Sequence, residues 1–295
     1  MAAPLVGKLL VLGGSSFVGK HLLARLTTAQ YTATYAANAC PGMVKFDCTS
    51  MRLAEAVGDL AAFDQALLLL GDTQPDSCVR DPARSQAVNV DGIKRVIGDL
   101  LAAGVRPIFV SSEFVFDGNK GRYSETDMPN PILLYGVQKL AVERYLESVT
   151  EDYAVLRLAK VYGGEIGDGT LFTNWLPAIE RGGQQKCASD QRFSPIYVDD
   201  VVDALLKVAE SRVRGVFHLG GPEGLSRMEC LEALLTQVRS VRPVAVETVP
   251  CRINDFEFSE TRPVDVSMRI DKLAAEIGFS PRRVEDFCHS LMAAK

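Results

Sequence analysis

The sequence predicts an α/β protein: a doubly wound parallel sheet with a small, discontinuous C-terminal lobe. Two observations lead to this fold class. The first 160 residues or so alternate short apolar runs with longer amphipathic ones, as in chains of strand–helix–strand units. A glycine-rich stretch, "VLGGSSFVGKHLL", follows directly after the first apolar run. Beyond about residue 163 the alternation loosens, which indicates that a second, smaller lobe begins there.

The strands of the predicted sheet are apolar runs without polar alternation, which is typical of strands buried on both faces. They are "KLLVLGG", "YTATYAA", "MVKFDCT", "QALLLLG", "RPIFVSS" and "YAVLRLAKVYG". Helical patterns lie between most of them, notably over residues 18–27, 82–103 and 131–149. In the last of these helices we expect Asn130 as the N-cap and Pro131 at the first helical position.

The C-terminal half mixes both lobes. "RFSPIYV", the helical pattern "DDVVDALLKVAE" and the run "GVFHLGG" are expected to return to the sheet, with Asp199 or Asp200 as a helix N-cap. We therefore assign 1–163 and 192–221 to a nucleotide-binding domain, and 164–191 and 222–295 to the smaller lobe. The two would form a cleft at the carboxyl ends of the strands.

Composition excludes several function classes. The chain is 47% apolar and 23% charged, with a net charge of −5 and no block of like charges, so neither nucleic acid nor a membrane surface is expected as a partner. Seven scattered cysteines without a CxxC pair indicate reduced thiols in a cytoplasmic protein. The three histidines show no metal-ligand spacing, so no metal is expected. The N-terminus is too quickly interrupted by glycine for a signal peptide or membrane span.

The glycine stretch has the position of a dinucleotide-binding turn, after the first strand and at the start of the first helix. Gly13 and Gly19 fit its outer positions, and Ser16 stands where a middle glycine is common. We expect Ser16, Phe17 and Val18 to lie against the pyrophosphate of a cofactor, as in a Rossmann-type domain. The alternative is a plain strand–helix connection.

The end of the second strand usually selects the cofactor. An acidic residue there would bind the ribose 2′-hydroxyl of NAD, but "TYAANACPG" contains neither an acid nor an arginine. NADP(H) is therefore favoured, and NAD(H) remains possible. Asp47, after the third strand, is a candidate for the adenine amino group or, alternatively, a helix N-cap. Gly71, which ends "QALLLLG", is also expected to contact the cofactor.

A tyrosine and a lysine form the candidate catalytic pair. Tyr135 and Lys139 are four residues apart on one predicted helix and so share a face. Upstream, the strand "IFVSS" ends in Ser111 and Ser112. Reduction of a ketone by hydride needs a proton for the developing alkoxide, and a tyrosine with a pKa of about 10 can supply it if a nearby cation stabilises the phenolate. Lys139 would be that cation and could also hold the nicotinamide ribose, so Tyr135 and Lys139 are also expected at the cofactor. Ser112 would donate a hydrogen bond to the same oxygen. A solvated surface pair is the alternative.

The order of these motifs resembles the extended short-chain dehydrogenase/reductase family. Gly13 and Gly19 are followed by "NVDG" (89–92), "VSSEFVFDG" and the Tyr135–Lys139 pair. The stretch "VSSEFVFDGNKGRYSETDMPNPILLYGVQKLAVE" is most similar to the dTDP-4-dehydrorhamnose reductases and their relatives, among them the regulatory β subunit of methionine adenosyltransferase. The resemblance continues through "RFSPIYVDDVVDA" and "RPVDVSMRIDKL". It implies a Rossmann domain with a small substrate domain, the roles above for Ser112, Tyr135 and Lys139, and support of a proton-relay water by Asn89.

The chain departs from these reductases at its substrate positions. Ser112, Glu113 and Phe114 stand where they usually carry Thr-Asp-Tyr, and Lys160 replaces a tryptophan. We expect Glu113, Phe114 and Lys160 to line the substrate cleft. Lys160 and Arg262 are candidates to bind a diphosphate, with surface solvation as the alternative.

Other polar residues are given structural interpretations. Arg157 is expected to form a structural pair in the sheet, and His218 to be a hydrogen-bonded core histidine. Trp175, on an amphipathic helix, fits either the cleft or the core.

The predicted function is an NAD(P)-dependent reductase of a keto group, on a nucleotide-activated 4-keto-6-deoxy sugar, with Tyr135 as the proton donor. Two alternatives are kept. One is a non-catalytic NADP-binding regulatory subunit of a partner enzyme. The other is an NAD-dependent sugar-nucleotide epimerase or dehydratase. The expected partner is a small-molecule substrate, and a homodimer is possible.

Overall fold

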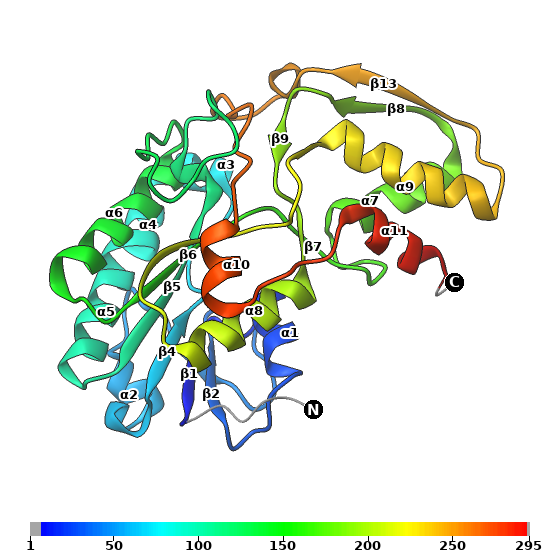
Figure 1. The fold of residues 1–295 in the computed structure, drawn as a ribbon. Helices are drawn as coiled ribbons and strands as arrows, with labels where there is room; N and C mark the ends of the chain where they lie inside the picture. Colours follow the sequence, from blue (N-terminus) through cyan, green and yellow to red (C-terminus); the bar gives the residue numbers. More distant parts are fainter. Residues whose placement is uncertain (1–6, 294–295) are drawn as a thin grey trace.

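Seven parallel strands form the central sheet, in the order β3-β2-β1-β4-β5-β6-β11 (Figure 1). The computed structural model describes residues 7–293 of the chain. Because β2 and β3 extend to one side of β1 and the later strands to the other, the order reverses between β1 and β4, where ligands of such sheets bind. The predicted fold class is confirmed. The strands are β1 (Leu9–Leu12), β2 (Tyr31–Tyr35), β3 (Val44–Lys45), β4 (Gln65–Leu68), β5 (Arg106–Ser112), β6 (Ala154–Leu158) and β11 (Gly215–Leu219).

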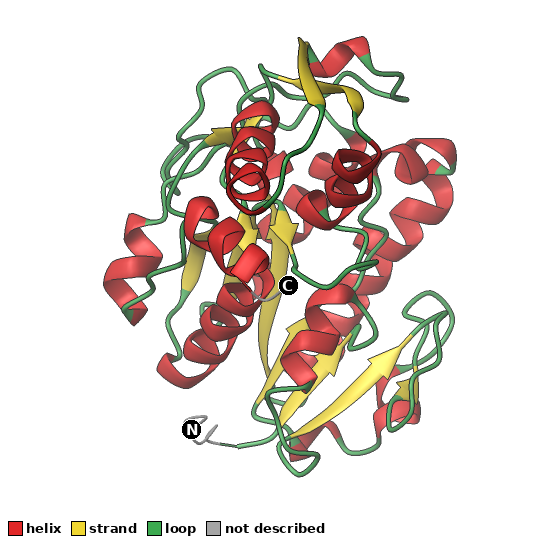
Figure 2. Ribbon diagram, turned by 90° about the vertical axis from the view of Figure 1, so that its right-hand side faces the viewer, coloured by secondary structure: helices red, strands yellow, loops and turns green. Residues whose placement is uncertain are grey.

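Helices cover both faces of this sheet (Figure 2). Side chains of β1 alternate between the faces: Leu9 and Val11 pack in one core, Leu10 and Leu12 in the other. The first core is closed by α1 (Phe17–Leu23), α8 (Val198–Ser211) and α10 (Asp271–Ile277), the second by α2 (Leu53–Val57), α5 (Ile93–Ala102) and α6 (Leu134–Val149). Fully burying one leucine side chain contributes about 1.5–3 kcal/mol to the free energy of unfolding. A strand with apolar side chains on both faces gains this from all of them only when both faces are covered by helices.

The helix predicted over residues 82–103 has an irregular middle. It consists of α4 (Pro82–Gln86), a π-helical turn η2 (Ala87–Gly92) and α5. A π-helical turn widens the helix locally and often occurs at functional sites. This one carries Asn89, which is fully buried.

A second set of elements surrounds its own apolar cluster. β8 (Gly183–Ala188) pairs with β13 (Val246–Cys251) beside α7 (Leu171–Arg181), α9 (Arg227–Val241) and α11 (Val284–Ala293) (Figure 1). Phe172, Leu231 and Phe287 belong to this cluster. We propose that 164–191 and 222–295 form the smaller lobe, from which α10 reaches back through Leu273 to the sheet core. The remaining elements are α3 (Pro75–Arg80), β7 (Val161–Tyr162) paired with β10 (Ile196–Tyr197), β9 (Arg192–Phe193) paired with β12 (Leu225–Ser226), and the 3₁₀ turns η1 (Leu60–Ala62), η3 (Glu113–Val115) and η4 (Ile253–Asp255).

Two predicted helix caps are wrong. α6 begins at Leu134 rather than Pro131, and the Asn130 amide instead donates to the Asp117 carboxylate at 3.0 Å. α8 begins at Val198, so Asp199 and Asp200 lie in its first turn and not at its cap. Asp200 accepts the backbone N–H of Arg282 at 3.0 Å, a contact from far along the chain.

The N-terminal residues 1–6, part of the segment expected to contain neither leader nor span, lie outside the described residues. Within 7–293, no helix combines the length and apolar character needed to cross a bilayer.

Candidate active site

Two adjoining cavities open at the carboxyl ends of the central strands. One, of about 900 Å³, is lined by Gly13 of the glycine stretch and is called here the glycine-turn cavity. The other, of about 490 Å³, is lined by Tyr135 and is called the tyrosine cavity. Ser16 lines both, as do Leu69 and Thr73 beyond the end of β4. A ligand can therefore extend from one cavity into the other.

The glycine turn is held in a tight conformation that needs its glycines. Gly13 has a φ of +91°, which disfavours residues with a side chain. A Cβ at Gly19 would lie 2.7 Å from the carbonyl oxygens of both Gly13 and Gly14, so α1 packs directly against the turn. The Ser16 hydroxyl accepts the Gly19 N–H at 3.1 Å and caps α1. Phe17 and Val18 line the tyrosine cavity, whereas Gly19 lines neither cavity.

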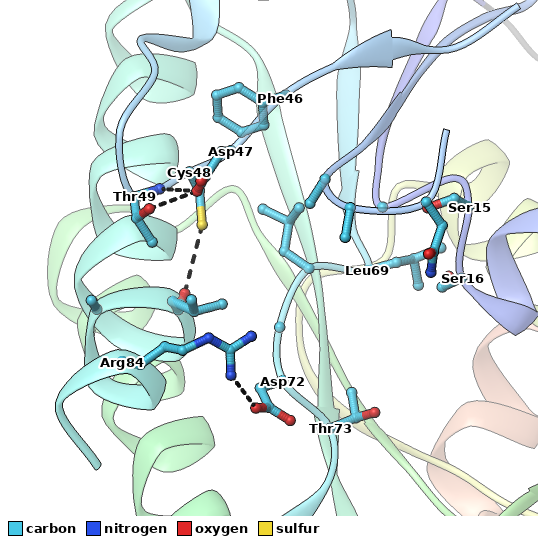
Figure 3. Close-up of a pocket in the computed structure, with 18 of the residues that line it drawn as sticks. Ser15, Ser16, Phe46, Asp47, Cys48, Thr49, Leu69, Asp72, Thr73 and Arg84 are labelled. Carbon is cyan, nitrogen blue, oxygen red and sulfur yellow. Dashed lines mark hydrogen bonds and ion pairs between the residues drawn. The ribbon is translucent and has the colours of Figure 1, made fainter. Parts of the chain in front are cut away.

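Asp47 lies across the glycine-turn cavity from Ser15 and Ser16 (Figure 3). Its carboxylate accepts the Thr49 hydroxyl at 2.7 Å and the Thr49 N–H at 2.8 Å, and these bonds lower the pKa of Asp47. The next α-helix, α2, begins only at Leu53 with Arg52 at its cap position, so the alternative of an α-helix N-cap at Asp47 is wrong. Gly71 lines the same cavity.

The end of β2 contributes Ala36, Ala37 and Asn38 to this cavity, with no charged group. A cation lies there nonetheless: Lys45, on the neighbouring strand β3, is part of the cavity wall. Arg84 also lines the cavity, but it pairs with Asp72 at 3.1 Å (Figure 3). Lys45 was not predicted from the sequence, because only the pairing of β2 with β3 brings it beside the end of β2.

Ser112, Tyr135 and Lys139 meet in the wall of the tyrosine cavity. Ser112 ends β5, and the other two lie one turn apart on α6; all three side chains are buried. Burial raises the pKa of Tyr135, and a hydrogen bond with Ser112 acts against that rise. The Tyr135 hydroxyl is therefore protonated at neutral pH, which is the form that a proton donor needs.

Lys139 is buried beside aromatic rings. Its Nζ donates to the Val110 carbonyl at 2.9 Å and lies 4.7 Å from the centroid of the Phe109 ring. Burial lowers the pKa of Lys139 to about 8, while the charge of Glu143 opposes the change. The ammonium form therefore predominates near pH 7, close to its titration range.

Asn89 is not part of either cavity wall. Its Oδ1 accepts the Asp72 N–H at 2.7 Å, and its Nδ2 donates to the Asp72 carbonyl at 3.0 Å and to Gln138 at 2.8 Å. The amide thus ties the loop after β4 to α6, the helix of the tyrosine–lysine pair. Support of a relay water by Asn89 stays a prediction.

The four residues predicted for the substrate all line the tyrosine cavity: Glu113, Phe114, Lys160 and Arg262. Glu113 is buried, and its Oε2 has no hydrogen-bond partner. Burial raises the pKa of Glu113 to about 8, against the charge and backbone N–H of Lys160. Phe114 packs edge-to-face on Tyr135 with ring centroids 6.4 Å apart, and Arg262 pairs with Asp76 at 2.8 Å.

The smaller lobe adds two residues to the wall of the tyrosine cavity, Gln191 and Arg227, that were not predicted from the sequence. Arg227, the first residue of α9, lines the tyrosine cavity and donates through Nε to Gln191 at 2.6 Å. Nothing local in the sequence places Arg227 there, because its position depends on how the lobe packs.

Among the described residues no group of three or more His, Cys, Asp or Glu side chains could hold a metal ion.

The structural roles predicted for Arg157 and His218 are confirmed. Arg157 forms a buried ion pair at 2.8 Å with Glu143, which lies on α6 and not in the sheet. His218 is fully buried, and its Nδ1 lies 3.2 Å from the Arg269 carbonyl. Trp175 packs edge-to-face on Phe172 in the lobe's apolar cluster and lines neither cavity.

Comparison with known proteins places this geometry in context. A family model described as "RmlD substrate binding domain" matches residues 7–294. The dTDP-4-dehydrorhamnose reductase of Mycobacterium tuberculosis is 29% identical over 254 residues, which cover 82% of this chain and 81% of the relative. Methionine adenosyltransferase 2 subunit beta of Bos taurus is 31% identical over 166 residues, 54% of this chain and 49% of the relative.

Solved structures show the same fold. A dTDP-4-dehydrorhamnose reductase from Bacillus anthracis, solved in complex with NADP, matches with a TM-score of 0.80 at 18% identity. The match covers 98% of this chain and 99% of that one.

Proposed function

The chain belongs to the family of the RmlD substrate binding domain, and from this membership we propose that it is an NADP(H)-dependent reductase of a keto group. The proposed substrate is a nucleotide-activated 4-keto-6-deoxy sugar. One observation carries the proposal: Ser112, Tyr135 and Lys139 meet in one cavity, next to a second cavity lined by the glycine turn. The similarity to named dTDP-4-dehydrorhamnose reductases supports it.

In the proposed reaction each of the three side chains has one role. The bound reduced nicotinamide supplies the hydride for the carbonyl carbon. Tyr135 donates its phenolic proton to the carbonyl oxygen as negative charge develops there. Ser112 donates a hydrogen bond to that oxygen, and the Lys139 ammonium stabilises the phenolate that Tyr135 leaves behind.

The cofactor side of the proposal rests on the shape and charge of the glycine-turn cavity. The close approach of α1 to Gly13 and Gly14 leaves a backbone surface suited to a pyrophosphate. The uncharged end of β2 lacks the carboxylate that would bind a ribose 2′-hydroxyl, and Lys45 nearby suits a 2′-phosphate. NADP(H) is therefore the proposed cofactor, and the relative solved with NADP supports the choice.

Three cations in the wall of the tyrosine cavity support a substrate that carries a diphosphate. Lys160, Arg227 and Arg262 line the tyrosine cavity, and only Arg262 of the three has a carboxylate partner within ion-pair distance among the described residues. Guanidinium and ammonium groups suit the two charges of a nucleotide diphosphate. Lys160 in place of an aromatic residue leaves no ring at this position for a sugar to stack on, so a cation and not a ring faces the sugar there.

The test is direct turnover. Protein is mixed with NADPH or NADH and a panel of nucleotide 4-keto sugars, and the absorbance of the reduced nicotinamide is followed. Consumption of NADPH with at least one 4-keto sugar is expected. Tight NADPH binding without turnover of any panel member would contradict the proposal.

A regulatory subunit that binds NADP is the second candidate. The similarity to methionine adenosyltransferase 2 subunit beta favours it. It predicts cofactor binding and a change in a partner enzyme's activity, with no consumption of nicotinamide. An epimerase or dehydratase with permanently bound NAD is disfavoured by the uncharged end of β2.

A further inference from the structure

A segment of the smaller lobe crosses from β13 back to the main body and borders the tyrosine cavity. It runs over residues 253–262 and is called the strap here; Figure 1 shows it as the orange chain that passes beside α3. Ile253, Phe258 and Arg262 of the strap line the tyrosine cavity. The strap therefore forms one wall of the proposed substrate site.

The strap is fastened to α3 through Asp76. The Asp76 carboxylate accepts the Ser259 N–H at 2.9 Å and an Arg262 nitrogen at 2.8 Å. The Arg262 guanidinium also lies 4.5 Å from the centroid of the Phe258 ring. Asp76 of α3 thus contacts the strap at two residues, Ser259 and Arg262.

A second contact joins the strap to α6. The carboxylate of Glu260 accepts the backbone N–H of Leu134 at 2.9 Å. Leu134 is the first residue of α6, Tyr135 is the second, and the helix's own cap residue, Leu133, makes no side-chain cap bond. A helix start needs acceptors for its first N–H groups, and here one comes from 126 residues away. A carboxylate at this end also interacts favourably with the helix dipole.

Two charged groups of the strap keep unused hydrogen-bonding capacity. Glu260 Oε2 and Arg262 Nη1 are buried and have no hydrogen-bond partner, and the same holds for Glu113 Oε2 in the wall of the tyrosine cavity. Leaving such atoms unpaired costs about 1–3 kcal/mol each, more for charged groups. Arg262 and Glu113 line the tyrosine cavity, whereas Glu260 lines neither cavity, so a ligand there meets the unpaired atoms of Arg262 and Glu113.

We propose that Glu260 is a positioning residue for Tyr135: the strap supplies the cap of the helix that carries the proton donor, and Arg262 of the same strap has an unpaired nitrogen, Nη1, for an anionic substrate group. The inference rests on the proposed function, since it assigns Tyr135 the proton. It predicts that Tyr135 is aligned only while the strap is in contact with α6. The strap thereby links the proposed substrate contact to the position of the proton donor.

The experiment compares Glu260→Ala with Glu260→Gln, which keeps a carbonyl acceptor for the Leu134 N–H. Asp59→Ala is the matched control, because Asp59 caps η1 by accepting the Ala61 N–H at 3.0 Å and lines neither cavity. We expect Glu260→Ala to lower kcat by roughly 10–100-fold, since small misplacements of a catalytic group have costs of this order. NADPH affinity should stay unchanged, and Glu260→Gln should restore most of the rate. Equal rates for Glu260→Ala and wild type, or a Gln variant as slow as the Ala variant, would overturn the proposal.

Amide hydrogen exchange separates this proposal from the proposed reaction. In the NADPH-bound protein, a peptide covering residues 134–139 should exchange faster in Glu260→Ala than in wild type or Glu260→Gln. Asp59→Ala should leave that peptide unchanged. Unaltered exchange at 134–139 in Glu260→Ala would refute the strap's role even if the wild type turns over. A wild type without turnover would instead contradict the reaction. Asp76→Asn, which removes the ion pair that orients Arg262 in the cavity wall, should mainly raise KM; an unchanged KM would count against Arg262 as the substrate contact.

Discussion

The ammonium nitrogen of Lys139 lies 5.7 Å from the centroid of the Tyr135 ring. The same nitrogen donates to the Val110 carbonyl of β5, the strand that ends in Ser112. One lysine thus connects the helix of the proposed proton donor with the strand of the proposed hydrogen-bond donor. A surface pair would show neither the burial nor the strand contact.

Replacing Tyr135 by phenylalanine removes one hydroxyl and keeps the ring that packs on Phe114. We expect turnover to fall by roughly 10²–10⁴, the usual contribution of a positioned general acid. Stability and NADPH affinity should hardly change. Steady-state kinetics and calorimetric titration would measure both. Tyr145→Phe, on the same helix, is the control; a rate unaffected by Tyr135→Phe would rule out Tyr135 as the acid.

Lys139→Ala distinguishes an enzyme from a regulatory subunit. In a reductase, losing the cation should reduce turnover, and losing the predicted contact of Lys139 with the nicotinamide ribose should weaken NADPH binding. A regulatory subunit would also bind NADPH less well, but no variant would consume it. Titration and absorbance measurements on the same protein samples give both readouts. Unchanged binding and unchanged turnover together would mean that the pair has no functional role.

The sequence was sufficient wherever structure follows from local pattern. Apolar runs predicted the strands of the sheet, but the expected return of "RFSPIYV" to it is wrong, because β9 pairs with β12 and β10 with β7 outside the central sheet. The spacing of Tyr135 and Lys139 predicted a shared helix face, and the strand end at Ser112 predicted that the three would lie near one another. Each of these depends on residues within one element or on the general rule that parallel strands end at the same edge.

Tertiary contacts decided what the sequence could not. Asn130 has the chemistry of an N-cap, but its amide is engaged by Asp117, and Glu260 provides the cap contact at α6 from another lobe. The π-helical turn at Asn89 has no local signal, because it is held by bonds to Asp72 and Gln138. Arg227 and Lys45 reach their cavities only through lobe packing and strand pairing.

Asn89→Ala should weaken both the fold and the cofactor site. It leaves the Asp72 N–H and the Gln138 amide oxygen without their present partners, which costs about 2–4 kcal/mol of unfolding free energy. Cofactor affinity should fall as well, because Gly71 and Asp72 line the glycine-turn cavity. Chemical denaturation and titration with NADPH would measure these effects. Asn174→Ala, which removes an exposed amide bonded to the Gly169 carbonyl, is the control. A stable variant with normal affinity would show that the amide does not hold this loop.

Lys45→Ala should reduce the preference for NADPH over NADH. A charge-assisted hydrogen bond to a 2′-phosphate is worth about 1.5–3 kcal/mol, or roughly tenfold or more in affinity. Binding of NADH, which lacks this phosphate, should not change. Titrations of both cofactors with the wild type, Lys45→Ala and the surface control Lys94→Ala give the comparison. If all three proteins discriminate equally, the phosphate is recognised by another group.

Glu113 should make the stability of the protein depend on pH. Burial raises the pKa of Glu113 to about 8 from an ordinary value near 4.5, so between these values the folded protein keeps a proton that the unfolded chain has lost. The contribution of Glu113 to the free energy of unfolding therefore falls as the pH rises from about 4.5 to about 8. Above about pH 8 Glu113 is ionised in the folded protein, and the buried charge then destabilises the fold fully. Glu113→Gln removes the titration, so its stability relative to the wild type should increase between pH 5 and pH 9, by an amount on the order of a few kcal/mol. Urea denaturation at both pH values would measure the difference, with the exposed Glu55→Gln as control. A difference between Glu113→Gln and wild type that stays constant from pH 5 to pH 9 would mean that the Glu113 carboxyl is solvated in the folded protein and ionises like a free glutamate.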